Sequence, residues 1–151
     1  MDIFGFKNQG INYDKFRPTY PPKFLTHYIT TLKHKNRYLD IATGTGQLLF
    51  AIAPHFLSSK GVDISPQMIT TAQGKIEQFR EKYPDSKIEL EVGGVMDIKS
   101  EEKYDFITVG QALHFFPIED SLRKIKTLLR EDGTFVTFGY ILKTAQSNKP
   151  N

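Results

Sequence analysis

Residues 37–50, RYLDIATGTGQLLF, place a glycine-rich turn between two apolar segments. The first segment, residues 37–42, has the length and apolar character of a short buried strand. The second starts at Gly46 and carries apolar residues at helical spacing, so the glycines lie where a strand passes directly into a helix. Glycine at such a turn permits positive φ and lets a ligand approach the backbone closely. Because any tight turn can use glycine, the turn by itself leaves a structural role and a ligand-binding role equally open.

Beyond this turn, strand patterns alternate with helix patterns along the chain. Such alternation predicts right-handed βαβ units and a parallel sheet. We therefore predict an α/β fold, a Rossmann-like doubly wound parallel sheet of strand order 3-2-1-4-5 with helices on both faces. The other predicted strands are residues 60–64, 87–92, 104–110 and 134–142, and the predicted helices are residues 21–32, 46–57, 65–83 and 118–130.

Length and composition place the chain among ordinary globular domains. At 151 residues it fits one domain, and its net charge of +3 comes from basic residues scattered among acidic ones. This scatter predicts no nucleic-acid partner, which would need a clustered basic stripe. The chain has no cysteine, no membrane-length apolar run and no leader-like N-terminus, so we expect a cytoplasmic protein without a membrane partner. His27, His34 and His55 lack partners at metal-ligand spacing, so we expect no metal site.

A second acid strengthens the ligand-binding interpretation of the turn. Asp63 ends the second predicted strand, 17 positions after Gly46. An acid at this place can accept hydrogen bonds from the ribose hydroxyls of an adenosine cofactor, although an acid at a helix start is also favoured by the helix dipole. The pairing of turn and acid favours the cofactor. Neither a dinucleotide fingerprint nor a phosphate-binding loop fits, because Leu49 replaces the third glycine and no Lys-Ser/Thr follows the turn.

Four ordered segments resemble one enzyme family. YLDIATGTG (38–46) and GVDISPQMI (61–69) are similar to the class I S-adenosylmethionine (SAM)-dependent methyltransferases. YDKFRPTYPPKFLTHY (13–28) and VGQALHFF (109–116) resemble the type 11, trans-aconitate-methyltransferase-like subgroup. The resemblance covers Tyr13 to Tyr140, and it implies SAM as the cofactor, S-adenosylhomocysteine as its product and no metal.

The resemblance implies cofactor contacts around the glycine-rich turn. Asp40 would orient the loop or bind the methionine amine through water, and Gly44 and Gly46 would pass beneath the methionine portion. Asp63 would hold the ribose. Ala42 stands where the family has its first glycine. The full set of implied cofactor-binding residues is Tyr13, Arg17, Asp40, Ala42, Thr43, Gly44, Gly46, Asp63, Ile64, Met96, Asp97 and Gln111.

On the acceptor side, the resemblance implies that Arg17 and Tyr20 belong to a lid over the cofactor. Gln111 and His114 would face the transferable methyl or the acceptor, so Arg17, Tyr20 and His114 are the predicted substrate contacts. The planar guanidinium of Arg17 suits a carboxylate, but a surface arginine held by the neighbouring prolines fits equally. His114 could act as a general base or as a hydrogen-bonded spacer, and no other catalytic residue is predicted.

One departure from the family concerns the adenine. The family's third strand commonly runs into a small-Ala-Glu segment, whereas this chain has Met96 in place of the acid and Asp97 beside it. Met96 could pack against adenine as an adaptable apolar surface. Alternatively, Asp97 could recognise the adenine after a shift of one residue.

The other departure is at the end of the chain. The resemblance divides a single domain into a lid segment and first helix (1–35), a SAM-binding core (36–142) and a frayed tail (143–151). The family sheet normally continues into an antiparallel hairpin beside the fifth strand, which we expect this chain to lack. The apolar fifth strand would then be an exposed edge. Either the chain is a truncated form, or a partner chain or second copy covers this edge in a homo- or hetero-oligomer.

Together these features predict an enzyme that transfers the methyl group of SAM to a small-molecule acceptor, with a carboxylate as the suggested acceptor. SAM is already activated, so the protein mainly has to align the acceptor and exclude water. A carboxylate needs no catalytic base, which agrees with the lack of a catalytic dyad. The alternative is a SAM-binding or scaffold subunit that keeps the fold without turnover. An RNA-directed enzyme is disfavoured, because the Asn/Asp-Pro-Pro-aromatic segment expected after the fourth strand is absent.

Overall fold

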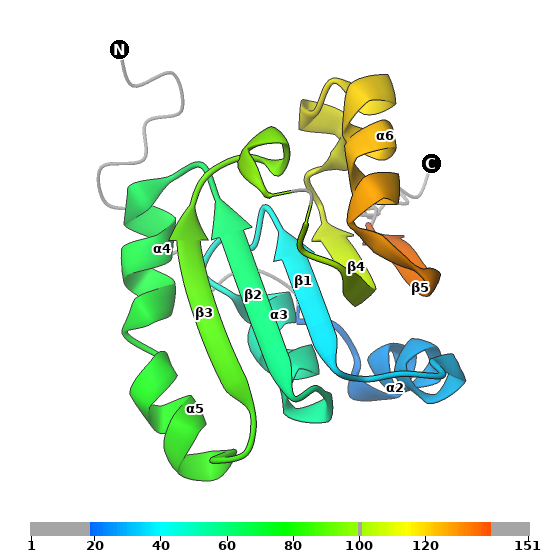
Figure 1. Ribbon diagram of the computed structural model, residues 1–151. Helices are drawn as coiled ribbons and strands as arrows, with labels where there is room; N and C mark the ends of the chain where they lie inside the picture. Colours follow the sequence, from blue (N-terminus) through cyan, green and yellow to red (C-terminus); the bar gives the residue numbers. More distant parts are fainter. Residues whose placement is uncertain (1–18, 100, 140–151) are drawn as a thin grey trace, which may run out of the picture.

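A five-stranded parallel sheet forms the centre of the computed structural model, which describes residues 19–99 and 101–139 (Figure 1). The strand order is β3-β2-β1-β4-β5, and every neighbouring pair is parallel. The predicted Rossmann-like α/β fold and its strand order are therefore confirmed. The strands are β1 (Arg37–Ile41), β2 (Ser58–Asp63), β3 (Lys87–Val92), β4 (Tyr104–Gly110) and β5 (Leu129–Phe138).

Within the described residues the chain forms five α-helices and three short 3-10 turns. The helices are α2 (Pro22–Thr31), α3 (Gln47–Ile52), α4 (Pro66–Gln73), α5 (Ile76–Lys82) and α6 (Ile118–Leu128), and the turns are Ala53–His55, Val95–Asp97 and Leu113–Phe115. Proline begins both α2 and α4, at a position where no backbone donor is needed. The Ser65 hydroxyl accepts a hydrogen bond from the Met68 N–H at 3.3 Å and so caps α4, as the sequence predicts.

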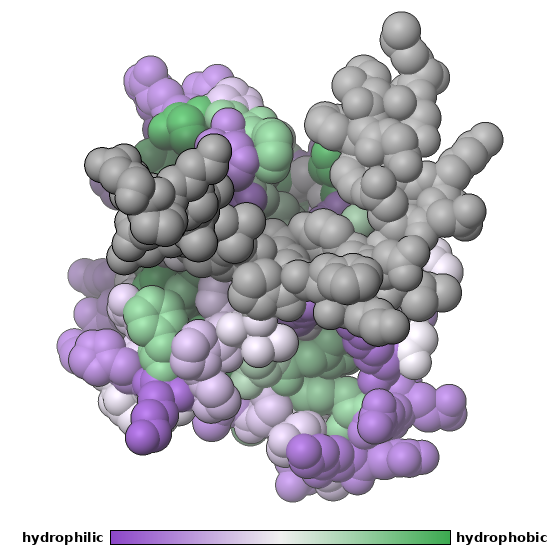
Figure 2. Space-filling view, turned by 180° about the vertical axis from the view of Figure 1, so that it is seen from behind, coloured by the Kyte–Doolittle hydropathy of each residue, from purple (hydrophilic) through white to green (hydrophobic). Residues whose placement is uncertain are grey.

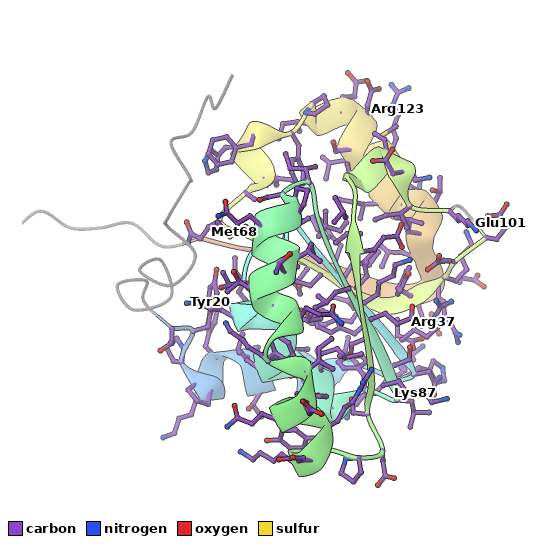
Figure 3. The ribbon with its side chains drawn as sticks, turned by 90° about the vertical axis from the view of Figure 1, so that its left-hand side faces the viewer. Tyr20, Arg37, Met68, Lys87, Glu101 and Arg123 are labelled. Carbon is purple, nitrogen blue, oxygen red and sulfur yellow. The ribbon has the colours of Figure 1, made fainter. Side chains whose placement is uncertain are left out.

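Helices cover both faces of the sheet. Apolar side chains of α2, α3 and α5 pack with Tyr38 in one core cluster, whereas those of α6 pack with Leu39 in a second cluster. Since successive residues of a strand point to opposite faces, the two clusters lie on opposite sides of the sheet. Figure 3 looks along the sheet and shows Tyr20 on one side and Arg37 on the other.

The predicted helix over residues 65–83 is in fact two helices. α4 and α5 are separated at Gly74 and Lys75, and Gly74 is the C-cap of α4. Glycine is a weak helix former, so a break at this residue costs little. The break places the Lys75 Nζ where it donates a hydrogen bond to the Thr45 carbonyl at 2.9 Å, in the glycine-rich turn.

The fifth strand starts earlier than predicted. α6 ends at Leu128 instead of Arg130, and β5 begins at Leu129 rather than at residue 134. Leu129 pairs with Tyr104, while Thr134 pairs with Phe106, so the register shifts between these two pairs. A bulge of this kind inserts extra residues without ending the strand. Residues 140–142 of the predicted strand lie outside the described residues.

An aromatic cluster joins the segment around α2 to the last strand. The ring of Phe138, at the end of β5, contacts Tyr20, Phe24 and Tyr28 edge-on, with centroid distances of 5.5, 5.5 and 5.6 Å. Such edge-to-face pairs each contribute about 0.5–1.5 kcal/mol beyond the burial of their area. The chain entering α2 is therefore held against the carboxyl end of β5.

The exposed features of the described residues are one face of the surface and the two edges of the sheet. Figure 2 shows hydrophilic residues along the left and lower edges of this face, with apolar residues exposed between them and at its upper edge. In residues 19–99 and 101–139, no helix is long and apolar enough to cross a membrane. β3 and β5 are the edge strands of the described sheet, and the predicted partner at the β5 edge stays a prediction.

Replacing Phe106 by alanine should strongly destabilise the fold. Its ring is fully buried and packs against the rings of Tyr38 and Phe56, with centroid distances of 5.6 and 6.0 Å. We expect the free energy of unfolding, measured with urea, to fall by about 3–5 kcal/mol. Phe115→Ala is the matched control, because that ring is 70% exposed and its loss should change stability by less than about 0.5 kcal/mol. Equal losses in both variants would contradict the position of Phe106 in the core.

Candidate functional site

The glycine-rich turn, residues 42–46, connects β1 to α3. Its backbone has positive φ at Ala42 (56°), Gly44 (57°) and Gly46 (86°). The two glycines are needed for different reasons. A Cβ at Gly46 would lie 2.5 Å from the Phe50 ring, whereas a Cβ at Gly44 would meet none of the described residues within 4 Å. Gly46 therefore allows close packing inside the protein, and Gly44 leaves space in which a ligand can approach the backbone.

Asp63, at the end of β2, holds the turn from the neighbouring strand. Its carboxylate accepts one hydrogen bond from the Gly44 N–H at 2.8 Å and one from the Ser65 N–H at 2.9 Å. The two bonds go to different oxygens, and each oxygen has further acceptor capacity. The Asp63 side chain is half-buried. It can therefore hold the turn and still accept hydroxyl groups from a ligand.

Asp40, the acid of β1, is a buried carboxylate at 1% exposure. Its Oδ2 accepts a hydrogen bond from the Thr43 hydroxyl at 2.7 Å, and its Oδ1 accepts one from the Thr108 hydroxyl at 2.6 Å. Burial raises the pKa of Asp40 to about 6; the two hydroxyl hydrogen bonds oppose this rise, and the charge of Asp63 adds to it. The acid thus links β1, β4 and the turn from inside the protein.

The ends of β2 and β3 bring a second group of predicted residues together. Ile64 is 75% exposed, and its Cγ2 lies 3.6 Å from where a Cβ would stand at Gly94. The Asp97 carboxylate accepts a hydrogen bond from the Gly94 N–H at 2.8 Å and closes the turn after β3. Met96, in that turn, is 56% exposed. An exposed surface next to Asp63 is therefore formed by Ile64, Met96 and Asp97.

Gln111 follows β4 in an unusual conformation. Its φ is 59°, and its N–H donates a hydrogen bond to the Phe138 carbonyl at 2.8 Å. Its side-chain Nε2 is buried and has no hydrogen-bond partner among the described residues. Both a positive φ at a residue other than glycine and an unpaired buried donor cost free energy, and such costs tend to be concentrated at functional sites. Gln111 is therefore a candidate ligand contact.

Tyr20 and His114 lie near the end of β4 in different surroundings. A Cβ at Gly110 would stand 3.0 Å from the Tyr20 hydroxyl, so this hydroxyl lies over the last residue of β4. His114 is exposed, and its ring centroid lies 4.0 Å from that of Phe115. Tyr20 therefore reaches the strand end, whereas His114 lies on an exposed turn.

The described members of the predicted site gather at the carboxyl edge of the sheet. Apart from Tyr20, which precedes α2, they lie at or just beyond the carboxyl ends of β1, β2, β3 and β4, and the strand order reverses between β1 and β4. Doubly wound sheets bind their ligands outside this edge, at the reversal point. In the described ranges, no three acidic, histidine or cysteine side chains are placed to hold a metal ion. Predicted residues Tyr13 and Arg17 lie outside the described residues.

Sequence reasoning missed three residues that support the turn: Tyr38, Lys75 and Thr108. Thr108 donates to Asp40, and its Oγ1 lies 2.7 Å from the Tyr38 hydroxyl. Lys75 reaches the carbonyl of Thr45. A polar residue within the apolar segment FITVG was a weak signal for Thr108. For Tyr38 and Lys75 the sequence offers no comparable signal, because their partners are distant along the chain.

Comparison with known proteins identifies relatives. The methyltransferase domain family matches residues 39–135. The Saccharomyces cerevisiae protein named "Probable S-adenosylmethionine-dependent methyltransferase CRG1" is 29% identical over 136 residues, covering 88% of this chain and 46% of the yeast protein. A Dictyostelium discoideum protein with a methyltransferase name is 30% identical over 148 residues, covering 97% of this chain and 52% of that protein. This chain thus spans about half the length of the curated relatives it matches.

Solved structures share the fold. A SAM-dependent methyltransferase from Clostridium acetobutylicum matches with a TM-score of 0.66 at 26% identity, over 87% of this chain and 56% of that one. A Thiobacillus denitrificans SAM-dependent methyltransferase, solved with S-adenosylhomocysteine, matches with a TM-score of 0.67 at 18% identity, over 91% and 56%. At that identity the second match speaks for the fold alone.

The parallel sheet, the glycine-rich turn and the acid after β2 define the Rossmann-like class I fold of SAM-dependent methyltransferases. The chain belongs to the methyltransferase domain family. The expected family is thereby confirmed, while membership of the trans-aconitate-type subgroup stays a prediction.

Replacing Ala42 by glycine should stabilise the protein. A φ of 56° is strained for a residue with a Cβ, and glycine removes that strain. Despite the greater freedom of the unfolded chain, we expect the free energy of unfolding in urea to rise by about 0.5–1 kcal/mol. Ala72→Gly is the control, because Ala72 is buried inside α4 and glycine there should cost about 1 kcal/mol or more. A similar loss in both variants would contradict the left-handed backbone at Ala42.

The buried charge of Asp40 should make stability depend on pH. Because its pKa rises from 3.8 to about 6 on folding, the folded protein binds the proton more tightly than the unfolded chain between these values. Relative to Asp40→Asn, the wild type should therefore lose stability as pH rises from about 4 to 6, by on the order of 3 kcal/mol. Urea denaturation of both proteins across this range measures the difference. The exposed Asp85, changed to asparagine, serves as the control, and a pH-independent difference for Asp40→Asn would refute the expected shift.

Proposed function

We propose that this chain binds SAM at the carboxyl ends of β1, β2 and β3, and that the protein transfers the methyl group to a small-molecule acceptor. The contact between the Asp63 carboxylate and the Gly44 N–H carries the proposal. It holds a positive-φ turn next to an acid with spare acceptor capacity, and the described part of the chain leaves space beside Gly44. Family membership and the fold shared with the Clostridium acetobutylicum enzyme support the same cofactor.

The strand ends suggest how the nucleoside part would bind. Asp63 would accept hydrogen bonds from the ribose hydroxyls through the acceptor capacity that its two backbone donors leave open. The exposed apolar side chains of Ile64 and Met96 would pack against the adenine. Asp97 stands in the same turn as Met96. Its Oδ1 would accept from the adenine amino group, because its Oδ2 already accepts the Gly94 N–H. This assignment accommodates both Met96 and Asp97.

The methionine part would lie along the open backbone at Gly44. Asp40 is almost fully buried, and both its oxygens accept threonine hydroxyls. These contacts favour the role of orienting the loop over that of binding the methionine amine. Gly46 would contribute through its close packing on Phe50, which keeps the turn compact.

For the acceptor we propose a small molecule with a carboxylate. The sulfonium of SAM supplies an activated methyl group, and a carboxylate oxygen attacks it with no proton to remove. The residues then act mainly by alignment. The Tyr20 hydroxyl near Gly110 would orient the bound groups, together with Gln111 Nε2, which has no hydrogen-bond partner among the described residues. Arg17, in the proposed lid segment around Tyr13, Arg17 and Tyr20, would pair with the acceptor carboxylate, and His114 has an exposed position suited to a spacer.

Calorimetric titration with S-adenosylhomocysteine tests the cofactor site. Asp63→Ala should weaken binding by about 1.5–3 kcal/mol, the range of hydrogen bonds to a charged group. Asp85→Ala, at an exposed position before the amino end of β3, should leave the dissociation constant unchanged. An unchanged constant for Asp63→Ala would remove this residue from the site. No binding to the wild type at millimolar ligand would refute the cofactor itself.

Methyl transfer to a panel of small acceptors tests the rest of the proposal. Di- and tricarboxylates should accept the labelled methyl group, whereas amines and RNA should not. Transfer to amines alone would refute the carboxylate, and cofactor binding without transfer to any acceptor would favour a subunit that binds SAM without turnover.

A further inference from the structure

A chain of three buried polar groups runs along one face of β1 and β4. Asp40 and Thr108 are direct neighbours in the parallel register, and Tyr38 precedes Asp40 by two residues and so shares its face. Thr108 Oγ1 lies 2.7 Å from the Tyr38 hydroxyl and 2.6 Å from Asp40 Oδ1. All three residues are at most 1% exposed. The proposed cofactor would not touch Tyr38 or Thr108.

When Asp40 is ionised, its need for donors sets the direction of the hydrogen bonds among these three groups. Thr108 has one hydroxyl hydrogen, and it donates this hydrogen to the Asp40 carboxylate. The Tyr38 hydroxyl must therefore donate to Thr108. Burial raises the pKa of Tyr38 well above its usual value, so the phenol keeps its proton. Two hydroxyls thus point in sequence toward Asp40 and favour its ionised form.

The ionised Asp40 carboxylate also binds the glycine-rich turn. Its second oxygen accepts the hydroxyl of Thr43, which lies directly before Gly44. A protonated Asp40 would be a hydrogen donor itself, so it would compete with at least one of the two threonine donors. The position of the turn therefore depends on the charge of Asp40, and that charge depends on Thr108.

We propose that Thr108, supported by Tyr38, is a positioning residue for the cofactor, because it keeps Asp40 in the state that holds the glycine-rich turn ready for SAM. This inference rests on the proposed function, since it assumes that the turn binds SAM. Thr108 acts through Asp40 and Thr43, without contact to the ligand.

Other charged or ionisable groups surround these three residues. From β2, the carboxylate of Asp63 raises the pKa of Asp40, and from α3 the Leu49 amide lowers it. Lys75 donates to the Thr45 carbonyl in the turn, and the phenol of Tyr20 acts on Tyr38. Asp40 has a pKa of about 6, so cofactor binding should weaken as pH falls toward this value. Without the Thr108 hydroxyl that pKa should rise, and the loss of binding should begin at a higher pH.

The test is calorimetric titration of S-adenosylhomocysteine from pH 5.5 to 8.5 with wild type and variants. Thr108→Val keeps the side-chain shape and should move the loss of binding at low pH upward by about one pH unit. Binding at pH 6.5 should then be weaker than that of the wild type by roughly threefold, and the two affinities should converge toward pH 8.5. Thr108→Ser restores the hydroxyl and should recover most of the affinity and the original pH profile. Tyr38→Phe removes the hydroxyl that donates to Thr108 but keeps the one that donates to Asp40. It should therefore move the loss of binding at low pH in the same direction by a smaller amount.

Thr137→Val is the matched control. Thr137 lies on β5, and its hydroxyl donates to the Val109 carbonyl at 3.2 Å rather than to Asp40, so neither affinity nor pH profile should change. If the wild type binds and both Thr108→Val and Tyr38→Phe keep its affinity and pH profile, the inference is wrong. The inference is equally wrong if Thr137→Val shifts the pH at which binding is lost as far as Thr108→Val does. If the wild type does not bind, the proposed function fails first, so the two failures are distinguishable. Tyr38→Phe keeps the test decisive if Thr108→Val does not fold.

Discussion

A carboxylate inside a parallel sheet must be matched by hydrogen-bond donors, and at Asp40 these come from Thr43 and Thr108. Thr108 lies directly opposite on β4, so the match requires the observed register of β1 against β4. Thr43 lies in the turn, so the same match also requires the turn to fold back over the strand end. The need of the buried Asp40 carboxylate for donors is therefore satisfied by both the register of β1 against β4 and the conformation of the loop proposed to bind the cofactor.

Asp40 and Asp63 are suited to different roles, because different donors bind their carboxylates and they differ in burial. Asp63 is half-buried and accepts backbone N–H groups, which leaves acceptor capacity toward the outside. Asp40 is enclosed and accepts side-chain hydroxyls, so its effect on a ligand is indirect. The resemblance left two roles open for Asp40, orienting the loop or binding the methionine amine through water. Its burial favours the first role, whereas the half-buried Asp63 is suited to contact the ligand.

Features encoded by nearby residues were predictable, and features that depend on distant partners were not. The strands at 87–92 and 104–110 follow from local apolar patterns and match the structure. The bulge in β5 depends on how Leu129 and Thr134 pair with β4, so the sequence of β5 alone does not reveal it. Likewise, spacing suggested Asp63 beside the turn, but the support from Thr108 emerges only once β1 and β4 are neighbours.

The contacts of Phe138 also have a mechanical consequence. Its ring packs on Tyr20, Phe24 and Tyr28, so a single side chain at the end of β5 connects to three aromatic residues at the start of the described chain. Tyr20 in turn lies over Gly110, at the edge where the ligand would bind. A displacement of the segment entering α2 is thereby coupled to the last strand. The two ends of the described chain therefore pack against each other, and a shift of Tyr20 at the ligand-binding edge would disturb the packing of the outermost strand.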